Sequence, residues 1–242
     1  MAGYKLYSKS ELDISGLKVE VQRKNVKNLN LRVYPAERRV KVSIPRRISD
    51  SEVANFVESK LPWIHKHMAN YRRKPKLQPK KYITGELHPV WGKDLELVVI
   101  EMNKPSRIWV DGDKLKLFIR PETDQQKRAS VLKEWYRKEL KQTIPELIEK
   151  WEPKMDVKVE EFGVKYMKTR WGTCNIQARR IWFNLELAKK RPELLEYVVV
   201  HEMVHLLERL HSKRFYNFMT HFLPEWKSLK DELNGKSQIL DC

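Results

Sequence analysis

The sequence has few cysteines, no long apolar run and no leader-like N-terminus. Its two cysteines, Cys174 and Cys242, are too few for a disulfide framework and fit a reducing compartment. No stretch approaches the roughly 18 consecutive apolar residues of a membrane span. The start of the chain also lacks the apolar core and small-residue cleavage site of a signal peptide. We therefore expect a cytoplasmic protein with no membrane partner.

Acidic residues are also scarce relative to basic ones. The chain carries 49 Lys and Arg against 32 Asp and Glu, a formal net charge of +17. Such an excess favours anionic partners, either nucleic acid or acidic protein surfaces, although a basic solvated surface explains it equally well. With 242 residues, 41% of them hydrophobic, the chain can form one large domain or two small ones with a core. It carries no signal for an oligomeric state.

The first part of the chain is rich in predicted strands. Apolar residues alternate within 17–45, which predicts a small antiparallel sheet with "YPAERR" as a turn. Ser49 and Glu52 then form a capping box that begins a helix, which Pro62 should kink or break. The stretch "YRRKPKLQPKKY" (Tyr71–Tyr82) is polar and proline-containing, as expected of a linker. We therefore predict an N-terminal sheet-plus-helix domain over 1–78 and a second domain over 79–242.

The same order of elements recurs after this linker. Strands are predicted around 95–100, 107–110 and 115–119, with an Asp-Gly turn at Asp111–Gly112. A helix from about Thr123 to Trp151 should follow, interrupted by Pro145. The match to the first part is one of pattern more than identity, so it indicates at most a weak repeat of a ββα-like unit.

The last part mixes strands and helices, which makes the expected fold class α+β. Strands are predicted at 157–159, near 164–167, at "RWGTC" and at "RIWFNLEL". A helix should begin at Pro192, because proline suits the first helical position and Glu193 lies where the helix dipole favours negative charge.

The stretch "VVVHEMVHLLERLH" places polar groups inside this apolar helix. His201 and His205 are four residues apart, so both imidazoles project from one helix face, as two ligands of one metal ion must. Glu202 is offset by one residue, where it can take a proton from a metal-activated water. Unpaired, buried His and Glu would cost about a few kcal/mol each, so the pattern indicates a site more than a core.

A catalytic zinc ion takes three protein ligands and leaves one position open, so a third ligand is required. His211 is the preferred candidate, provided that the helix ends near Leu207–Leu210 and the chain folds back, and Ser212 is a suitable N-cap for a following helix. Glu225 and Glu232 remain alternatives, since a downstream helix can supply a carboxylate. The spacing equals that of the metzincin motif, but Glu208 stands in place of its glycine, which counts against a metzincin. We predict one zinc ion held by His201, His205 and His211.

The remaining histidines and the internal cysteine have simpler explanations. His65 and His67 are expected at the surface, His88 in a turn and His221 at the end of a short helix, none with a ligand-spaced partner. Cys174 in "RWGTC" could approach the metal site, but a lone strand cysteine is more often a small buried apolar residue.

The segments "MKTRWGTC" and "RIWFNLELAKKRPELLEYVVVHEMVHLLERLHSKRFYNFMTHFLPEW" resemble the YgjP-like, SprT-related family of zinc metallopeptidase domains. The resemblance is closest over 156–233, which would be the catalytic core. It implies a zincin-like C-terminal domain, zinc at His201, His205 and His211, and Glu202 acting on the bound water. It also implies that either "RWGTC" or "RIWFNLEL" lies along the substrate.

Three functions are compatible with these patterns. The first is a zinc-dependent peptidase acting on a protein or peptide, with Glu202 as general base. The second is a metal-dependent nucleotide pyrophosphohydrolase, which would also use an activated water and a basic pocket. The third is a non-enzymatic nucleic-acid-binding module with a structural zinc. Three histidines and an acid leave a coordination position open, which favours catalysis over a structural role.

Overall fold

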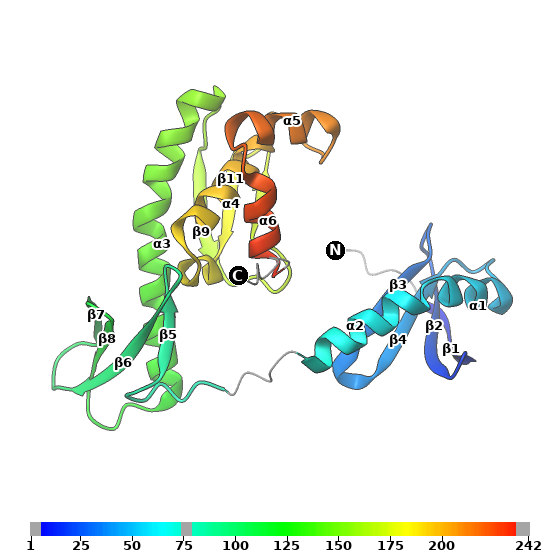
Figure 1. The fold of residues 1–242 in the computed structure, drawn as a ribbon, viewed down its shortest axis with the longest axis horizontal. Helices are drawn as coiled ribbons and strands as arrows, with labels where there is room; N and C mark the ends of the chain where they lie inside the picture. Colours follow the sequence, from blue (N-terminus) through cyan, green and yellow to red (C-terminus); the bar gives the residue numbers. More distant parts are fainter. Residues whose placement is uncertain (1–5, 74–78, 236–242) are drawn as a thin grey trace, which may run out of the picture. The chain divides into compact units, whose positions relative to one another are not determined.

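The computed structural model describes residues 6–73 and 79–235. The chain divides into two compact units, Met1–Pro79 and Lys80–Cys242, each with its own hydrophobic core (Figure 1). Of the sequence-predicted linker, residues 71–73 belong to a helix, whereas 74–78 and Cys242 lie outside the described residues. No helix in the described part is long and apolar enough to cross a bilayer.

The first unit contains a four-stranded sheet with the order β1-β2-β4-β3. Its strands are β1 (Leu6–Ile14), β2 (Leu17–Lys24), β3 (Asn30–Tyr34) and β4 (Arg39–Ile44). The prediction of an antiparallel sheet was wrong in one respect, because β2 and β4 pair in parallel. Period-2 alternation shows which face of a strand is buried but not which strand lies beside it. Strand β1 was not predicted from the sequence, because most of its residues are exposed and show no apolar alternation.

Two helices cover the apolar face of this sheet. Helix α1 (Asp50–Ser59) begins with the predicted capping box: the Glu52 amide donates to Ser49 Oγ, and the Ser49 amide donates to the Glu52 carboxylate. Helix α2 (Leu61–Arg73) starts one residue after the C-cap Lys60, so the break near Pro62 is confirmed. Their inner faces and the sheet bury one cluster: Val19, Val21, Val40, Val42, Ile44, Val53, Val57 and Ile64.

The second unit begins with a sheet of the same topology. Its strands are β5 (Leu87–Val90), β6 (Lys93–Glu101), β7 (Arg107–Asp111) and β8 (Lys114–Ile119), in the order β5-β6-β8-β7. The pair orientations match those of the first unit, since β6 and β8 are parallel and the other two pairs antiparallel. The weak sequence repeat thus corresponds to a repeated four-stranded sheet. His88, expected in a turn, lies on β5 and is 4% exposed.

Helix α3 (Gln125–Met155) follows this sheet as one continuous helix. The prediction that Pro145 interrupts it was wrong, because Pro145 and Pro153 both lie within it. Proline removes one backbone hydrogen bond, but the buried face of α3 continues on both sides of Pro145 into the same core. This face comprises Leu132, Tyr136, Leu140, Ile144, Ile148, Trp151 and Met155. Tertiary packing therefore outweighs the local cost.

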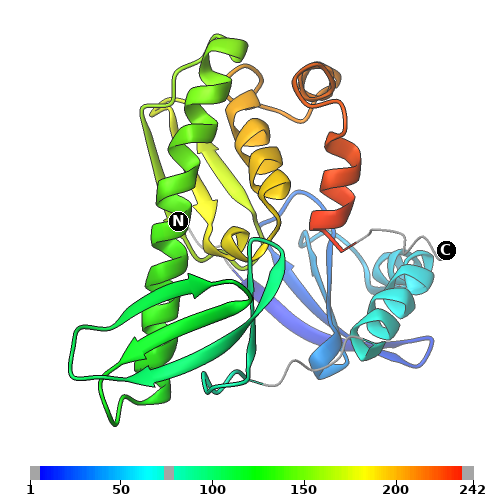
Figure 2. The ribbon, with the colours of Figure 1, turned by 60° about the vertical axis from the view of Figure 1, so that its left-hand side comes forward.

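The rest of the second unit is a small sheet with three further helices. The sheet has the order β10-β11-β9, from β9 (Glu161–Lys165), β10 (Gly172–Asn175) and β11 (Arg180–Asn184). After a short 3-10 helix, Leu185–Lys189, come α4 (Pro192–Val204), α5 (Lys213–Phe222) and α6 (Trp226–Leu233). Both α3 and α4 pack against this sheet (Figure 2). The predicted strand at 157–159 is not formed, and "RIWFNLEL" is a strand only as far as Asn184.

Candidate metal centre

Helix α4 positions the first two histidines and the glutamate. It begins at Pro192, as predicted, and is buried along most of its length, which fixes its rotation about its own axis. His201 lies in its last turn, and His205 is the C-cap residue with helical φ and ψ of −64° and −18°. The two imidazole centroids are 5.1 Å apart, so the histidines remain one turn apart on one face.

The chain turns back immediately after His205. Helix α4 ends at Val204, a few residues earlier than predicted, because the amides of Leu206 and Leu207 bond carbonyls three residues back and tighten the turn. No residue of 205–212 has a positive φ, so this reversal does not require the glycine that Glu208 replaces. Ser212 then caps α5, as predicted, by accepting a hydrogen bond from the Phe215 amide.

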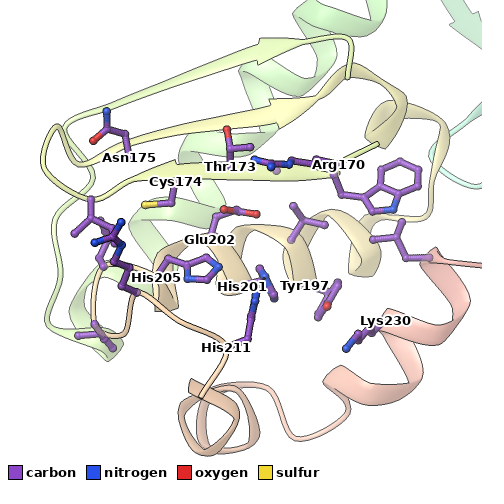
Figure 3. A pocket seen from close by; sticks show the side chains of 18 of the residues that line it. Arg170, Thr173, Cys174, Asn175, Tyr197, His201, Glu202, His205, His211 and Lys230 are labelled. Atoms are coloured by element: carbon purple, nitrogen blue, oxygen red, sulfur yellow. Dashed lines mark hydrogen bonds between the residues drawn. The ribbon is translucent and has the colours of Figure 1, made fainter. Parts of the chain in front are cut away.

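This reversal brings His211 to the two helix histidines. One ring nitrogen from each of His201, His205 and His211 lies within 4.8 Å of the others, and the Nε2 atoms of His201 and His211 are 3.1 Å apart (Figure 3). Two nitrogens on a tetrahedral zinc ion, each about 2.05 Å from it, would be about 3.3 Å apart. The Phe215 ring packs against all three imidazoles at centroid distances of 5.0, 4.7 and 4.7 Å. The three side chains therefore fit one metal ion.

The protonation of these histidines also suits a metal. Burial, with the neighbouring His205 and His211, lowers the pKa of His201 to about 3. Burial likewise lowers the pKa of His205 and of His211, so all three rings are neutral near pH 7 and offer lone pairs. His205 Nδ1 lies 3.2 Å from the Glu208 carbonyl oxygen. Since a carbonyl only accepts, Nδ1 carries the proton and Nε2 is free to bind a metal.

Glu202 lies under strand β10. Its side chain is nearly buried, at 5% exposure, and no hydrogen-bond partner for its carboxylate exists among residues 6–73 and 79–235. Burial raises the pKa of Glu202 to about 8, and the charge of Arg170 opposes this rise. A buried acid without a partner costs free energy in a purely structural role, so Glu202 suits a carboxylate that exchanges protons with a bound molecule.

Gly172 on β10 makes room for Glu202. A Cβ atom at Gly172 would lie 2.6 Å from both Cγ and Oε1 of Glu202, well inside van der Waals contact. The backbone of Gly172 does not have a positive φ, so a larger residue is excluded here by the carboxylate and not by conformation. The glycine of "RWGTC" is therefore needed to leave space for the Glu202 side chain.

Replacing Gly172 with alanine should displace Glu202 without unfolding the chain. Misplacing a proton-transfer group by about 1 Å costs about 100-fold in rate, so a reaction that depends on Glu202 should slow by about 100-fold. Metal content should stay unchanged, because the three atoms nearest to the added Cβ all belong to Glu202. Turnover and zinc content of Gly172→Ala would be measured together. In a Glu202→Gln background the same substitution should cost little more, since Gly172 acts through Glu202. A full additional loss would show that Gly172 has another role.

A groove of about 1290 Å³ opens above these residues. The segment 169–177, including β10, lines one side, while α4 and the following turn form the floor (Figure 3). Helix α6 contributes Lys230 and Leu233, and its C-cap residue Asn234 also lines the groove. Strand β10 is an edge strand, so its outer backbone groups are free, whereas β11 is paired on both sides. The groove thus joins the three histidines and Glu202 to a strand edge that can accept an extended chain.

Asn184 holds the loop that leads into β10. Its Nδ2 donates to the carbonyls of Met167 (2.8 Å) and Arg170 (2.7 Å), and its Oδ1 accepts from the Glu186 amide (3.2 Å). Asn184 belongs to the segment that resembles the family, but no local sequence pattern indicates its role. Tyr197 also lines the groove, one helical turn before His201, and was not among the predicted site residues, although its i, i+4 relation to His201 is readable in the sequence.

The alternative ligands have other positions. Glu232 accepts hydrogen bonds from Arg191 Nε (2.7 Å) and Nη2 (2.6 Å), and Glu225 is the exposed residue before α6. Neither joins the metal-ligand group found among the described residues. Cys174 lines the groove, but burial and the charge of Glu202 raise the pKa of its thiol to about 12, which disfavours a thiolate.

Comparison with known proteins identifies the family of this chain. No curated protein matches the chain. Among solved structures it is similar to the metallopeptidase zymogen abylysin of Pyrococcus abyssi, with 18% identity, a TM-score of 0.36, and coverage of 39% of this chain and 94% of that one. It is likewise similar to the metallopeptidase zymogen jannalysin of Methanocaldococcus jannaschii, with 17% identity, a TM-score of 0.35, and coverage of 38% and 95%. A model of the YgjP-like metallopeptidase domain matches residues 27–236, so this chain belongs to the YgjP-like metallopeptidase family.

Proposed function

We propose that this protein is a zinc-dependent metallopeptidase with a zincin-like catalytic domain, and that one zinc ion is held by His201, His205 and His211. The observation that carries the proposal is the convergence of three neutral imidazoles within 4.8 Å beside a buried, unpartnered glutamate. Membership of a metallopeptidase family supports the hydrolytic chemistry. An all-histidine set suits zinc, which binds neutral imidazole well.

Glu202 is the proposed general base. When bound, zinc supplies a Lewis acid that polarises the scissile carbonyl and makes water more acidic. Glu202 takes a proton from the attacking water and returns it to the leaving amide nitrogen. Its burial favours this exchange, because a carboxylate with a raised pKa holds a proton more readily than an exposed one and can then release it to the amine.

The substrate is proposed to lie along β10. The sequence left "RWGTC" and "RIWFNLEL" as equal candidates, and the strand order favours the first, because only an edge strand has unpaired backbone groups. An extended peptide could add to β10 by main-chain hydrogen bonds, which place a scissile bond over the groove without depending on its side chains.

Removal of metal tests the proposal directly. We expect a chelator to abolish peptide hydrolysis and zinc to restore it, because all three proposed ligands converge on one ion. Cleavage of an unfolded protein substrate would be followed by mass spectrometry, with zinc measured by elemental analysis. Hydrolysis that persists in metal-free protein would refute the metallopeptidase function.

The pyrophosphohydrolase alternative also has an observation in its favour, namely the basic residues that line the groove. It predicts zinc-dependent phosphate or pyrophosphate release from nucleoside triphosphates without peptide cleavage. Both reactions would be assayed on the same preparation, so that the product formed decides between the two functions. A nucleic-acid-binding module with structural zinc would show neither reaction and would bind DNA or RNA in a strongly salt-dependent way.

A further inference from the structure

The groove has an unbalanced set of charged residues. Apart from the histidines, its charged lining residues are Arg170, Arg209, Lys230 and Glu202, of which only the nearly buried Glu202 is acidic. Asp231 follows Lys230 in sequence but does not line the groove. A bound zinc ion would add further positive charge next to three neutral imidazoles.

None of the three cations forms a salt bridge within the parts of the chain that the structure describes, although Arg170 lies near enough to Glu202 for its charge to oppose the rise of that carboxyl's pKa. An unpaired cation beside a cleft leaves its field to act on whatever enters the cleft, and low-dielectric walls focus that field.

Lys230 is held in place without being neutralised. Its ammonium lies 5.5 Å from the Trp226 ring centroid and 5.8 Å from that of Tyr216. Tyr216 is itself stacked between Trp226 (5.2 Å) and His211 (6.2 Å). Aromatic faces attract a cation but leave its full charge. Lys230 is therefore positioned beside the metal centre by its helix and two rings.

The cations lie on more than one side of the metal centre. Figure 3 shows Lys230 reaching from α6 toward Tyr197 and His211, while Arg170 lies on the β10 side of Glu202. Arg209 lines the groove from the turn after His205. A peptide that crosses the groove along β10 would thus meet positive charge on both walls.

From this arrangement we infer that the groove selects acidic peptide segments, with Lys230 as a specificity-determining residue. The inference rests on the proposed peptidase function. Each acidic side chain that meets one of these exposed or half-buried cations should bind more tightly by a small factor, and each basic one more weakly. Two or three such contacts correspond to a preference of about tenfold at low salt, which should weaken as salt increases.

The test uses binding, so that turnover is not needed to see selectivity. Three fluorescein-labelled peptides would carry Glu, Gln or Lys at the positions that flank one neutral dipeptide, and would be titrated into full-length, zinc-loaded Glu202→Gln protein with anisotropy as readout. We expect the Glu peptide to bind about tenfold more tightly than the Gln peptide, and the Lys peptide to bind most weakly. The kcat/KM values of the wild-type protein should follow the same order.

Matched variants separate Lys230 from the general basic charge. Lys230→Gln should reduce the Glu-to-Gln preference about threefold, and Lys230→Arg should retain it. Lys227→Gln is the control, because Lys227 lies on the same helix over the same Trp226 ring but does not line the groove. It should leave the preference unchanged.

The outcomes distinguish failure of the acidic selectivity from failure of the proposed peptidase function. Equal binding or cleavage of all three peptides would overturn the acidic selectivity while the peptidase function stands. A preference that Lys230→Gln leaves intact would overturn the role of Lys230 as a specificity-determining residue. If ATP displaced the labelled peptide at a lower concentration than the unlabelled Glu peptide does, the acidic-peptide selectivity would be overturned in favour of a nucleotide substrate. Failure to bind or cleave any peptide would overturn both.

Discussion

Glu202→Gln is expected to lower kcat for peptide hydrolysis by about 10²- to 10⁴-fold, the usual contribution of a general base, while the protein still binds one zinc ion. Glutamine has nearly the same shape as glutamate and fits under Gly172, but its amide cannot accept a proton from water. The substitution also removes a buried carboxylate whose ionisation burial disfavours, so the fold should not be weakened. Turnover of an unfolded protein substrate and zinc content would be measured on one preparation.

The control for this variant lies in the same groove. Thr173→Ala changes a neighbouring lining residue of β10 that has no proposed part in proton transfer, and it should leave kcat within about tenfold. If Glu202→Gln retained both its zinc and wild-type hydrolysis, Glu202 would not be the base.

His211→Ala should weaken zinc binding by more than about 100-fold, since even residues that only orient a ligand contribute 10- to 100-fold. His211 supplies the one imidazole that comes from beyond α4 and its C-cap residue, and without it His201 and His205 offer only two of the three nitrogens. Zinc affinity would be measured by competition with a chromogenic chelator, and hydrolysis should fall in parallel at limiting zinc.

His221→Ala is the matched control, because His221 is an exposed histidine on α5 that takes no part in the cluster. Glu225→Gln tests the alternative carboxylate ligand and should leave zinc affinity unchanged. If His211→Ala kept the wild-type zinc affinity and Glu225→Gln lost it, the third ligand would be the Glu225 carboxylate and not His211.

Each copy of the repeated sheet contains one strand that apolar alternation does not indicate. Alternation located β2, β3 and β4 in the first unit and β6, β7 and β8 in the second, but it missed β1 and β5. In β1 most side chains are exposed, and β5 contains Pro89 and a histidine, so neither has a clear apolar period. Both are strands because β2 and β6 offer a backbone edge to pair with. Such pairing cannot be inferred from a local sequence pattern.

For the metal centre, short-range relations were readable and long-range ones were not. The i, i+4 spacing of His201 and His205, the N-cap at Ser212 and the helix start at Pro192 depend on backbone geometry within a few residues, and each recurs in the structure. The preference for His211 depended on a predicted chain reversal after α4, and α4 ends at Val204, a few residues before the predicted position.

The amino-acid sequence by itself determined which side chains α4 presents together, because helical periodicity is a local property of the backbone. It also determined where the main helices begin, since capping and proline act within one turn. Only the tertiary structure decided that β10 and not β11 has a free edge, that Gly172 leaves room for Glu202, and that Arg170, Arg209 and Lys230 line one groove. These relations join residues far apart in the chain, and they are set by the packing of α3, α4 and α6 with the sheet, which no local pattern encodes.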